Sequence, residues 1–217
     1  MRITIMNKRS VWLLLIILFG PLCAAGQTPA GTVGPDLKAR ISALLAGFPA
    51  DSPAEKDELC AGLLALGPAA VAETCARVLP PGGGDDAQAR FALNGLAVRV
   101  TRAGAEPERQ AFVRALLESL AASRDRDVAA FFISQVQLAG RSEAVAPLAR
   151  YLKDEALAGP VVAALQAIGD REAAAALLKA LDPAPPAVRP AIVEALGAMR
   201  VREAVKKLLP LAEGGDM

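Results

Sequence analysis

Histidine is absent from this chain of 217 residues, and this absence limits the chemistry that its side chains can perform. Catalytic triads with histidine, the His-Glu-x-x-His zinc motif and iron sites with two histidines all need the imidazole ring. The cysteines are Cys23, Cys60 and Cys75, and Cys23 lies in an N-terminal segment that we expect to be removed. Two cysteines cannot supply the four ligands of a structural zinc ion. We therefore expect neither a metal nor another cofactor.

Cys60 and Cys75 are spaced for a disulfide. Cys60 stands seven residues before Gly67, and Cys75 stands seven residues after Pro68. In an antiparallel helix hairpin that turns at Gly67-Pro68, the two cysteines would lie at similar heights. An oxidising compartment would then favour a disulfide, provided that the Cα atoms come within about 7 Å. The alternative is a pair of buried free thiols that act as small apolar residues.

Glu55, Asp57 and Glu58 form an acidic cluster that could serve acid–base chemistry. The cluster begins a predicted helix, where the helix dipole favours carboxylates. A catalytic carboxylate needs a pocket that shifts its pKa, and the start of an exposed helix offers none. We interpret the cluster as structural, with an enzyme that uses carboxylates alone as the alternative.

A glycine run lies in the segment 80–86 (PPGGGDD). Such a run before a helix can bind an anion through free backbone N–H groups. Here no Lys-Ser or Lys-Thr pair follows, and Asp85 and Asp86 would repel a phosphate. We interpret the segment as a loop between repeats, with an aspartate as the N-cap of the next helix.

Basic residues gather near the C-terminus, at Arg189, Arg200, Arg202, Lys206 and Lys207. As a functional surface they would contact an acidic partner protein or an anionic membrane. The alternative is a solvated helix face, since Arg and Lys suit the ends of helices and runs of charge often have no partner.

The overall charge gives no basis for binding nucleic acid. The formal net charge is +1, from 24 basic and 23 acidic residues. Removal of Arg2, Lys8 and Arg9 with the N-terminal segment leaves 21 basic residues and a net charge of −2. Binding to nucleic acid needs a basic face that replaces the counterions of phosphate.

One sequence motif occurs three times between Val128 and Ala212. A Glu-Ala pair recurs at 143, 172 and 203, with spacings of 29 and 31 residues, and a period in this range indicates stacked supersecondary units. Before each pair, apolar residues step by three or four along one helix face: Val128, Phe132, Val136, Ala139; Leu157, Val161, Leu165, Ile168; Val188, Ile192, Leu196, Met199. A second set follows each pair: Leu148, Leu152; Leu177, Leu181; Leu208, Ala212. The unit is therefore helix, tight turn, helix.

Segments 164–178 (ALQAIGDREAAAALL) and 195–209 (ALGAMRVREAVKKLL) resemble HEAT repeats, and most of all the short bacterial subclass named after phycobilisome lyases. The resemblance covers about residues 125–212 and fades toward the N-terminus. It implies an all-α, right-handed solenoid that binds other macromolecules, and it supplies no catalytic residue to carry over. A lyase activity on bilin pigments does not fit an exported chain, because such enzymes act in the cytoplasm.

Residues 1–26 are typical of a secretory signal peptide. Basic residues precede the apolar run 11–19 (VWLLLIILF), and small residues suit cleavage after Ala25 or Gly26. A membrane anchor is one alternative, but residues 11–25 are short for a bilayer. Lipidation of Cys23 is another, although Leu22 stands where a lipoprotein signal has a small residue. We expect a periplasmic or secreted chain without a stable membrane span after cleavage.

The mature chain is predicted to be a flexible leader at 27–35 followed by a HEAT-like solenoid at 36–217. Degenerate repeats occupy 36–122 and clearer repeats 125–212, giving about five helix pairs. We expect Asp36 to cap a further helix that closes the end of the stack. Phe131 and Phe132 cannot share one helix face, and we expect Phe131 to pack against a neighbouring repeat.

Repeats, export and the lack of catalytic groups together predict a non-enzymatic adaptor that binds another protein in a solenoid groove. The alternatives are a structural accessory module of an envelope complex, packed by its ends, and the carboxylate-only enzyme. The sequence identifies neither the partner nor the face that binds it.

Overall fold

The computed structural model describes residues 34–213, and every regular element in this range is a helix. The expected signal peptide, Cys23 and most of the expected leader lie outside the described residues. Pro35, the last residue of the expected leader, already belongs to the first helix. Within the described range no single helix is both long and apolar enough to cross a membrane, and two short helices pass that test only as a bent pair.

Eleven α-helices and one short 3-10 helix make up the described residues. Their bounds are α1 (Pro35–Leu45), α2 (Pro53–Ala65), α3 (Pro68–Cys75), α4 (Ala87–Arg99), α5 (Glu106–Ala122), α6 (Arg126–Ala139), α7 (Ser142–Ala149), η1 (Arg150–Lys153), α8 (Ala158–Ile168), α9 (Arg171–Ala180), α10 (Arg189–Ala198) and α11 (Arg202–Glu213).

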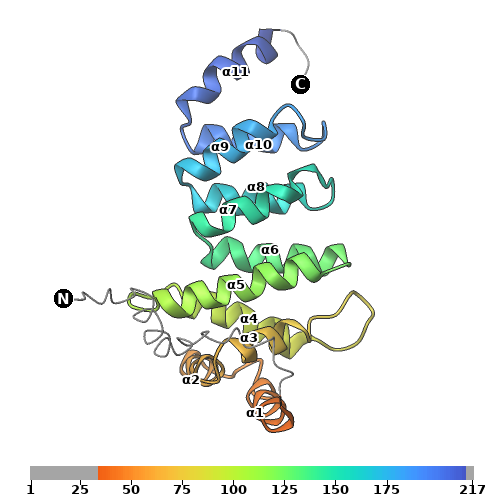
Figure 1. Cartoon of the computed structure of the whole chain (residues 1–217), viewed down its shortest axis with the longest axis vertical. Coiled ribbons are helices and arrows are strands. Elements are labelled where there is room, and N and C mark those ends of the chain that lie inside the picture. Colours follow the sequence, from red (N-terminus) through yellow and green to blue (C-terminus); the bar gives the residue numbers. More distant parts are fainter. Residues whose placement is uncertain (1–33, 214–217) are drawn as a thin grey trace, which may run out of the picture. The chain divides into compact units, whose positions relative to one another are not determined.

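The helices stack in chain order as five pairs, from α2–α3 to α10–α11, with α1 packed on the first pair (Figure 1). Contacts run from each first helix to the next, through α2, α4, α6, α8 and α10. A second layer joins α1, α3, α5, α7 and α9, and α11 packs on α10. This arrangement confirms the predicted all-α solenoid of helix pairs.

Side-chain caps explain where several helices begin. Ser52 accepts a hydrogen bond from the Glu55 N–H at 3.1 Å, and the Asp170 carboxylate accepts one from the Ala173 N–H at 2.7 Å. Such caps satisfy amide groups that have no partner within the helix. The expected cap at Asp36 is wrong: Gly34 is the N-cap of α1, and Asp36 lies in its first turn because the helix already begins at the proline before it.

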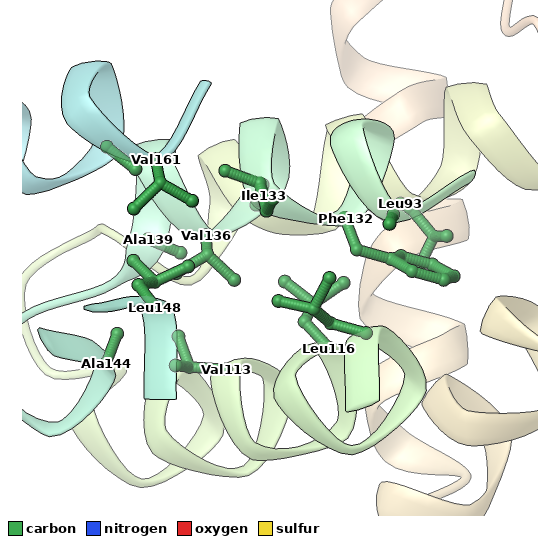
Figure 2. Packing of buried hydrophobic residues seen from close by; sticks show 14 of the residues in the cluster. Leu93, Val113, Leu116, Phe132, Ile133, Val136, Ala139, Ala144, Leu148 and Val161 are labelled. Atoms are coloured by element: carbon green, nitrogen blue, oxygen red, sulfur yellow. The ribbon is translucent and has the colours of Figure 1, made fainter. Parts of the chain in front are cut away.

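The core lies between the two layers and crosses every repeat boundary. Figure 2 shows Phe132 of α6 converging with Leu93 of α4 and Leu116 of α5. These three side chains are buried, as is Val161 of the following repeat. Because each first helix contacts the helices before and after it, no repeat has a core of its own.

Arg109 of α5 places a charged side chain inside this core. Its guanidinium group donates to both carboxylate oxygens of Glu106, at 2.7 and 2.9 Å. It also donates to the carbonyl of Ala139 at 2.9 Å and to Glu143 at 2.5 Å. These acceptors lie at the start of α5, the end of α6 and the start of α7, so one side chain ties three helices together.

Candidate functional site

The acidic cluster in α2 is engaged in structural contacts. The Glu55 carboxylate accepts a hydrogen bond from the Asp51 N–H at 2.8 Å. Asp57 forms ion pairs with Arg99 and Arg102, and Glu58 is exposed. The hydrogen bond from Arg99 lowers the pKa of Asp57 below its ordinary value, against the effect of desolvation.

Two other carboxyl groups have lowered pKa values, and both contact Arg109. Hydrogen bonds from Arg109 and then Gln110 lower the pKa of Glu106 to about 2. Burial alone would raise the pKa of Glu143, but the bond from Arg109 and further hydrogen bonds bring it below the ordinary value. A general acid at neutral pH needs a raised pKa, so none of these groups suits that role. Residues 34–213 also hold no cluster of three metal-ligating side chains.

Cys60 and Cys75 do not form the expected disulfide in the structure: both are free, buried thiols. The prediction assumed an antiparallel hairpin, whereas the chain bends by 112° between α2 and α3. A bend of 112° leaves 180° − 112° = 68° between the two arms, so at 1.5 Å per residue arms of seven residues end about 12 Å apart, beyond the reach of a disulfide. The Cys60 sulfur instead lies against α4, where a Cβ atom on Gly95 would approach it to 2.8 Å.

We expect both thiols to be present but slow to react in the folded protein. Burial raises the pKa of Cys60 and of Cys75 to about 11, so little reactive thiolate forms near neutral pH. Intact-mass measurement after alkylation without reductant should show two blocked thiols in the unfolded chain and almost none in the folded chain at pH 7.5. A mass without any blocked thiol after unfolding would show that Cys60 and Cys75 form a disulfide.

The glycine-rich segment 80–86 is a loop between α3 and α4, as expected. Asp86 precedes α4, but its carboxylate does not cap the helix. It accepts hydrogen bonds from the Leu79 N–H at 2.8 Å and from Arg90 at 2.7 Å. Arg90 in turn donates to the Leu79 carbonyl at 2.9 Å, so the two ends of the loop are fastened to each other. Asp85 accepts from the Ala87 N–H instead.

The predicted basic patch is divided by the structure. Arg189 donates to the carbonyls of Ala184 and Asp182, and Lys207 donates to the Leu178 carbonyl and pairs with Asp182 at 2.7 Å. Both side chains therefore fasten the loop between α9 and α10. The other three members, Arg200, Arg202 and Lys206, are exposed.

An exposed surface almost free of charge runs over the first helices of four repeats. We call it the first-helix face and define it by exposed residues of α4, α6, α8 and α10: Phe91, Asn94, Val98, Ser134, Gln137, Leu138, Gln166, Ala167, Glu194, Gly197 and Ala198. Its large apolar members are Phe91, Val98 and Leu138, exposed by 52%, 49% and 47%. Glu194 is the one charged residue of this set. Arg126, Asp127 and Arg189 are also exposed on these helices, but they lie at the N-terminal ends and outside the face.

The opposite layer differs sharply in charge. Exposed residues of α5, α9 and α11 include Arg114, Glu118, Arg171, Lys179, Arg202 and Lys206. We call this charged surface the second-helix face. The other large apolar side chains that are exposed in the described residues, Val205 and Leu209, lie on α11 among these charges. Exposed apolar side chains that gather on an uncharged surface mark an interaction surface more often than scattered ones do.

Phe131 borders the first-helix face and contacts the neighbouring repeat, as predicted. It is half-buried, and the Arg90 guanidinium of α4 stacks over its ring at 4.6 Å from the centroid. Gln135 lies one turn further along the same side of α6 and is buried. Its amide donates to Ser134, but its Oε1 atom has no partner within the described residues. This edge of the face therefore combines an aromatic ring under a guanidinium group with one acceptor that has no partner in the described residues.

No functional or structural role was predicted from the sequence for Phe91, Val98, Leu138 or Arg109. The signal was present: Phe91 and Leu138 fall outside the apolar stripes of their helices. Arg109 is the reverse case, a charged residue in step with the buried residues Phe112 and Val113.

The family model of the PBS lyase HEAT-like repeat matches residues 161–183, which span most of α8 and all of α9. This match confirms the resemblance that the repeated motif indicated. No protein of curated function and no solved structure was found to match the chain. The stacked helix pairs and the matched repeat together describe a repeat scaffold.

Proposed function

We propose that this HEAT-like repeat protein is an exported scaffold that binds another protein through its first-helix face and catalyses no reaction. The observation that carries the proposal is the contrast between the two layers. Phe91, Val98 and Leu138 are exposed on a surface with almost no charge, while the exposed apolar residues of the second-helix layer, Val205 and Leu209, share α11 with exposed charged residues. Large apolar side chains, and aromatic ones above all, supply most of the energy of protein interfaces.

The charge distribution suggests what the partner offers. A surface with a single carboxylate gives little attraction to a strongly acidic or basic partner. Small residues on α8 and α10 allow close approach, since an added Cβ atom at Gly197 would have no neighbour within 4 Å. The proposed partner therefore presents an uncharged, partly apolar segment.

The electrostatics support a role without catalysis. The pKa values of Asp57, Glu106 and Glu143 are lowered by arginine partners, whereas acid–base catalysis near neutral pH favours carboxyl groups with raised values.

Export is proposed from the sequence of the N-terminal segment alone. Sequencing of the protein recovered from the envelope should begin near Gly26 or Gln27, while Met1 would contradict cleavage and an acylated Cys23 would show a lipoprotein.

Site-specific photo-crosslinking in the producing cells tests the binding face. Variants Phe91→p-benzoylphenylalanine and Leu138→p-benzoylphenylalanine should form covalent adducts with the same partner. Arg114→p-benzoylphenylalanine, which probes the second-helix face, is the matched control and should form none. Adding Phe91→Glu to the Leu138 probe should reduce the adduct about 30-fold, the loss expected of an interface residue worth about 2 kcal/mol.

Two results would overturn the proposal. Adducts from Arg114 with none from Phe91 or Leu138 would place the partner on the second-helix face. No adduct from any of the three positions, in cells that export the protein normally, would show that neither face binds a protein.

A further inference from the structure

In the first helices of the last three repeats, the burial of one equivalent position changes along the stack. Ile133, Val162 and Val193 are equivalent, with the same spacings of 29 and 31 residues as the Glu-Ala pairs. Ile133 and Val162 are exposed by 0% and 3%, because each is followed by another repeat. Val193 of α10 is only half-buried.

The second helices show the same change more strongly. Val145, Ala174 and Val205 are equivalent, and Val145 is exposed by 5% whereas Val205 is exposed by 54%. Leu209 is also exposed by 54%, while its equivalents Ala149 and Leu178 are half-buried. We call Val193, Val205 and Leu209 the end patch. It consists of side chains at positions that a following repeat covers elsewhere in the stack.

Among the described residues, the opposite end of the stack has no such patch. There α1 covers the first pair, burying Ile41 and Leu45 against it. The exposed residues of α1 include Lys38, Arg40 and Ser42, so its outer surface is polar. A polar outer face is what the closing unit of a repeat stack needs. A second copy of the chain can therefore match the apolar end patch with its own end patch, but not with its α1 end.

Charges around the end patch suit pairing of two identical surfaces. Glu203 of α11 is exposed, and so are Arg202 and Lys206 of the same helix. In a two-fold arrangement each surface contacts its own copy, so acidic residues of one protomer can face basic residues of the other. Helices of 10 and 12 residues, about 15 to 18 Å long, offer a contact at the low end of specific interfaces.

We propose that two copies of this chain associate end to end through their end patches, in a two-fold symmetric and concentration-dependent dimer. Val205 and Leu209 of one protomer pack against the same residues of its partner. This pairing leaves the first-helix faces of both protomers open, and it is independent of the binding role proposed above. A contact at the low end of specific interfaces fits a weak dimer, and we expect a dissociation constant of about 10–100 µM.

Sedimentation velocity of the purified protein between about 5 and 300 µM tests the association. The unaltered chain should shift from monomer to dimer across this range. Val205→Glu should weaken the dimer at least about tenfold, because two buried carboxylates would then face each other. Val98→Glu is the matched control, since Val98 has nearly the same exposure at 49% but lies on the first-helix face. It should dimerise like the unaltered chain.

A cysteine crosslink distinguishes two-fold pairing from other arrangements. Val205→Cys should form a disulfide-linked dimer under mild oxidation, because the two residues 205 lie near the symmetry axis, while Val98→Cys should stay monomeric on a non-reducing gel. A monomer at every concentration would overturn the proposal. So would a dimer that Val205→Glu leaves intact, or species larger than a dimer. Circular dichroism of each variant verifies that the helices are retained.

Discussion

The Leu165→Ala variant should unfold with a free energy about 2–5 kcal/mol lower than that of the unaltered protein, the range found for leucines removed from packed cores. Leu165 is fully buried in α8, the helix that contacts both α6 and α10. Removing its side chain leaves a cavity at the junction of three repeats. Because each repeat is stabilised by its neighbours, the lost free energy lowers the stability of the whole stack. Urea unfolding followed by circular dichroism measures the difference.

Leu138→Ala is the control for this prediction. It makes the same chemical change in α6, but Leu138 is exposed on the first-helix face. Its unfolding free energy should stay within about 0.5 kcal/mol of the unaltered value. Equal effects of the two variants would mean that Leu165 is not in the core of the stack.

The Arg109→Met variant should lose about 2–4 kcal/mol of stability, the range for removing charged hydrogen bonds and leaving a buried acceptor unpaired. Methionine keeps much of the length of the side chain but donates no hydrogen bond. The Ala139 carbonyl at the end of α6 then loses its donor, and Glu106 and Glu143 lose theirs. Arg114→Met, which alters an exposed arginine of the same helix, should change stability by less than about 0.5 kcal/mol.

The pH dependence of unfolding gives an independent test of Arg109. The pKa of Glu106 is held at about 2, below its ordinary value of 4.5, and the pKa of Glu143 is also lowered. A lowered pKa in the folded state means that the stabilisation is complete above about pH 4.5 and is lost as the pH falls toward 2. Arg109→Met should make stability less dependent on pH across this window. An unchanged acid profile would show that the arginine does not hold these carboxylates.

The clear repeats could be predicted from the sequence because their information is local. Residues three and four apart share a helix face, so the stripes through Leu165 and Leu196 identified the buried sides of α8 and α10 without reference to any other part of the chain. In the structure the tight turn of the α8–α9 unit lies at Gly169, and the side chain of Asp170 caps the helix that follows. Export remains a prediction from residues 1–26, which the structure does not describe.

The candidate site could be predicted only in part, because exposure depends on neighbouring helices. Phe131 was expected to pack against a neighbouring repeat, and the Arg90 side chain that stacks over it comes from α4, 41 residues earlier in the chain. Phe91 and Leu138 lie outside the apolar stripes, yet whether such residues are covered depends on loops and helices that periodicity does not describe. The first-helix face appears only when four helices are placed side by side.

The sequence by itself determined the helices, their pairing into repeats and the membership of the fold class, because helix periodicity and turn residues act over a few positions. The tertiary structure alone decided whether Cys60 meets Cys75, since α2 and α3 meet at a bend of 112° and pack on α1, α4 and α5. It also decided that Val145 is buried while its equivalent Val205 is exposed. The two valines occupy the same place in the repeat, and they differ only in what lies next to them.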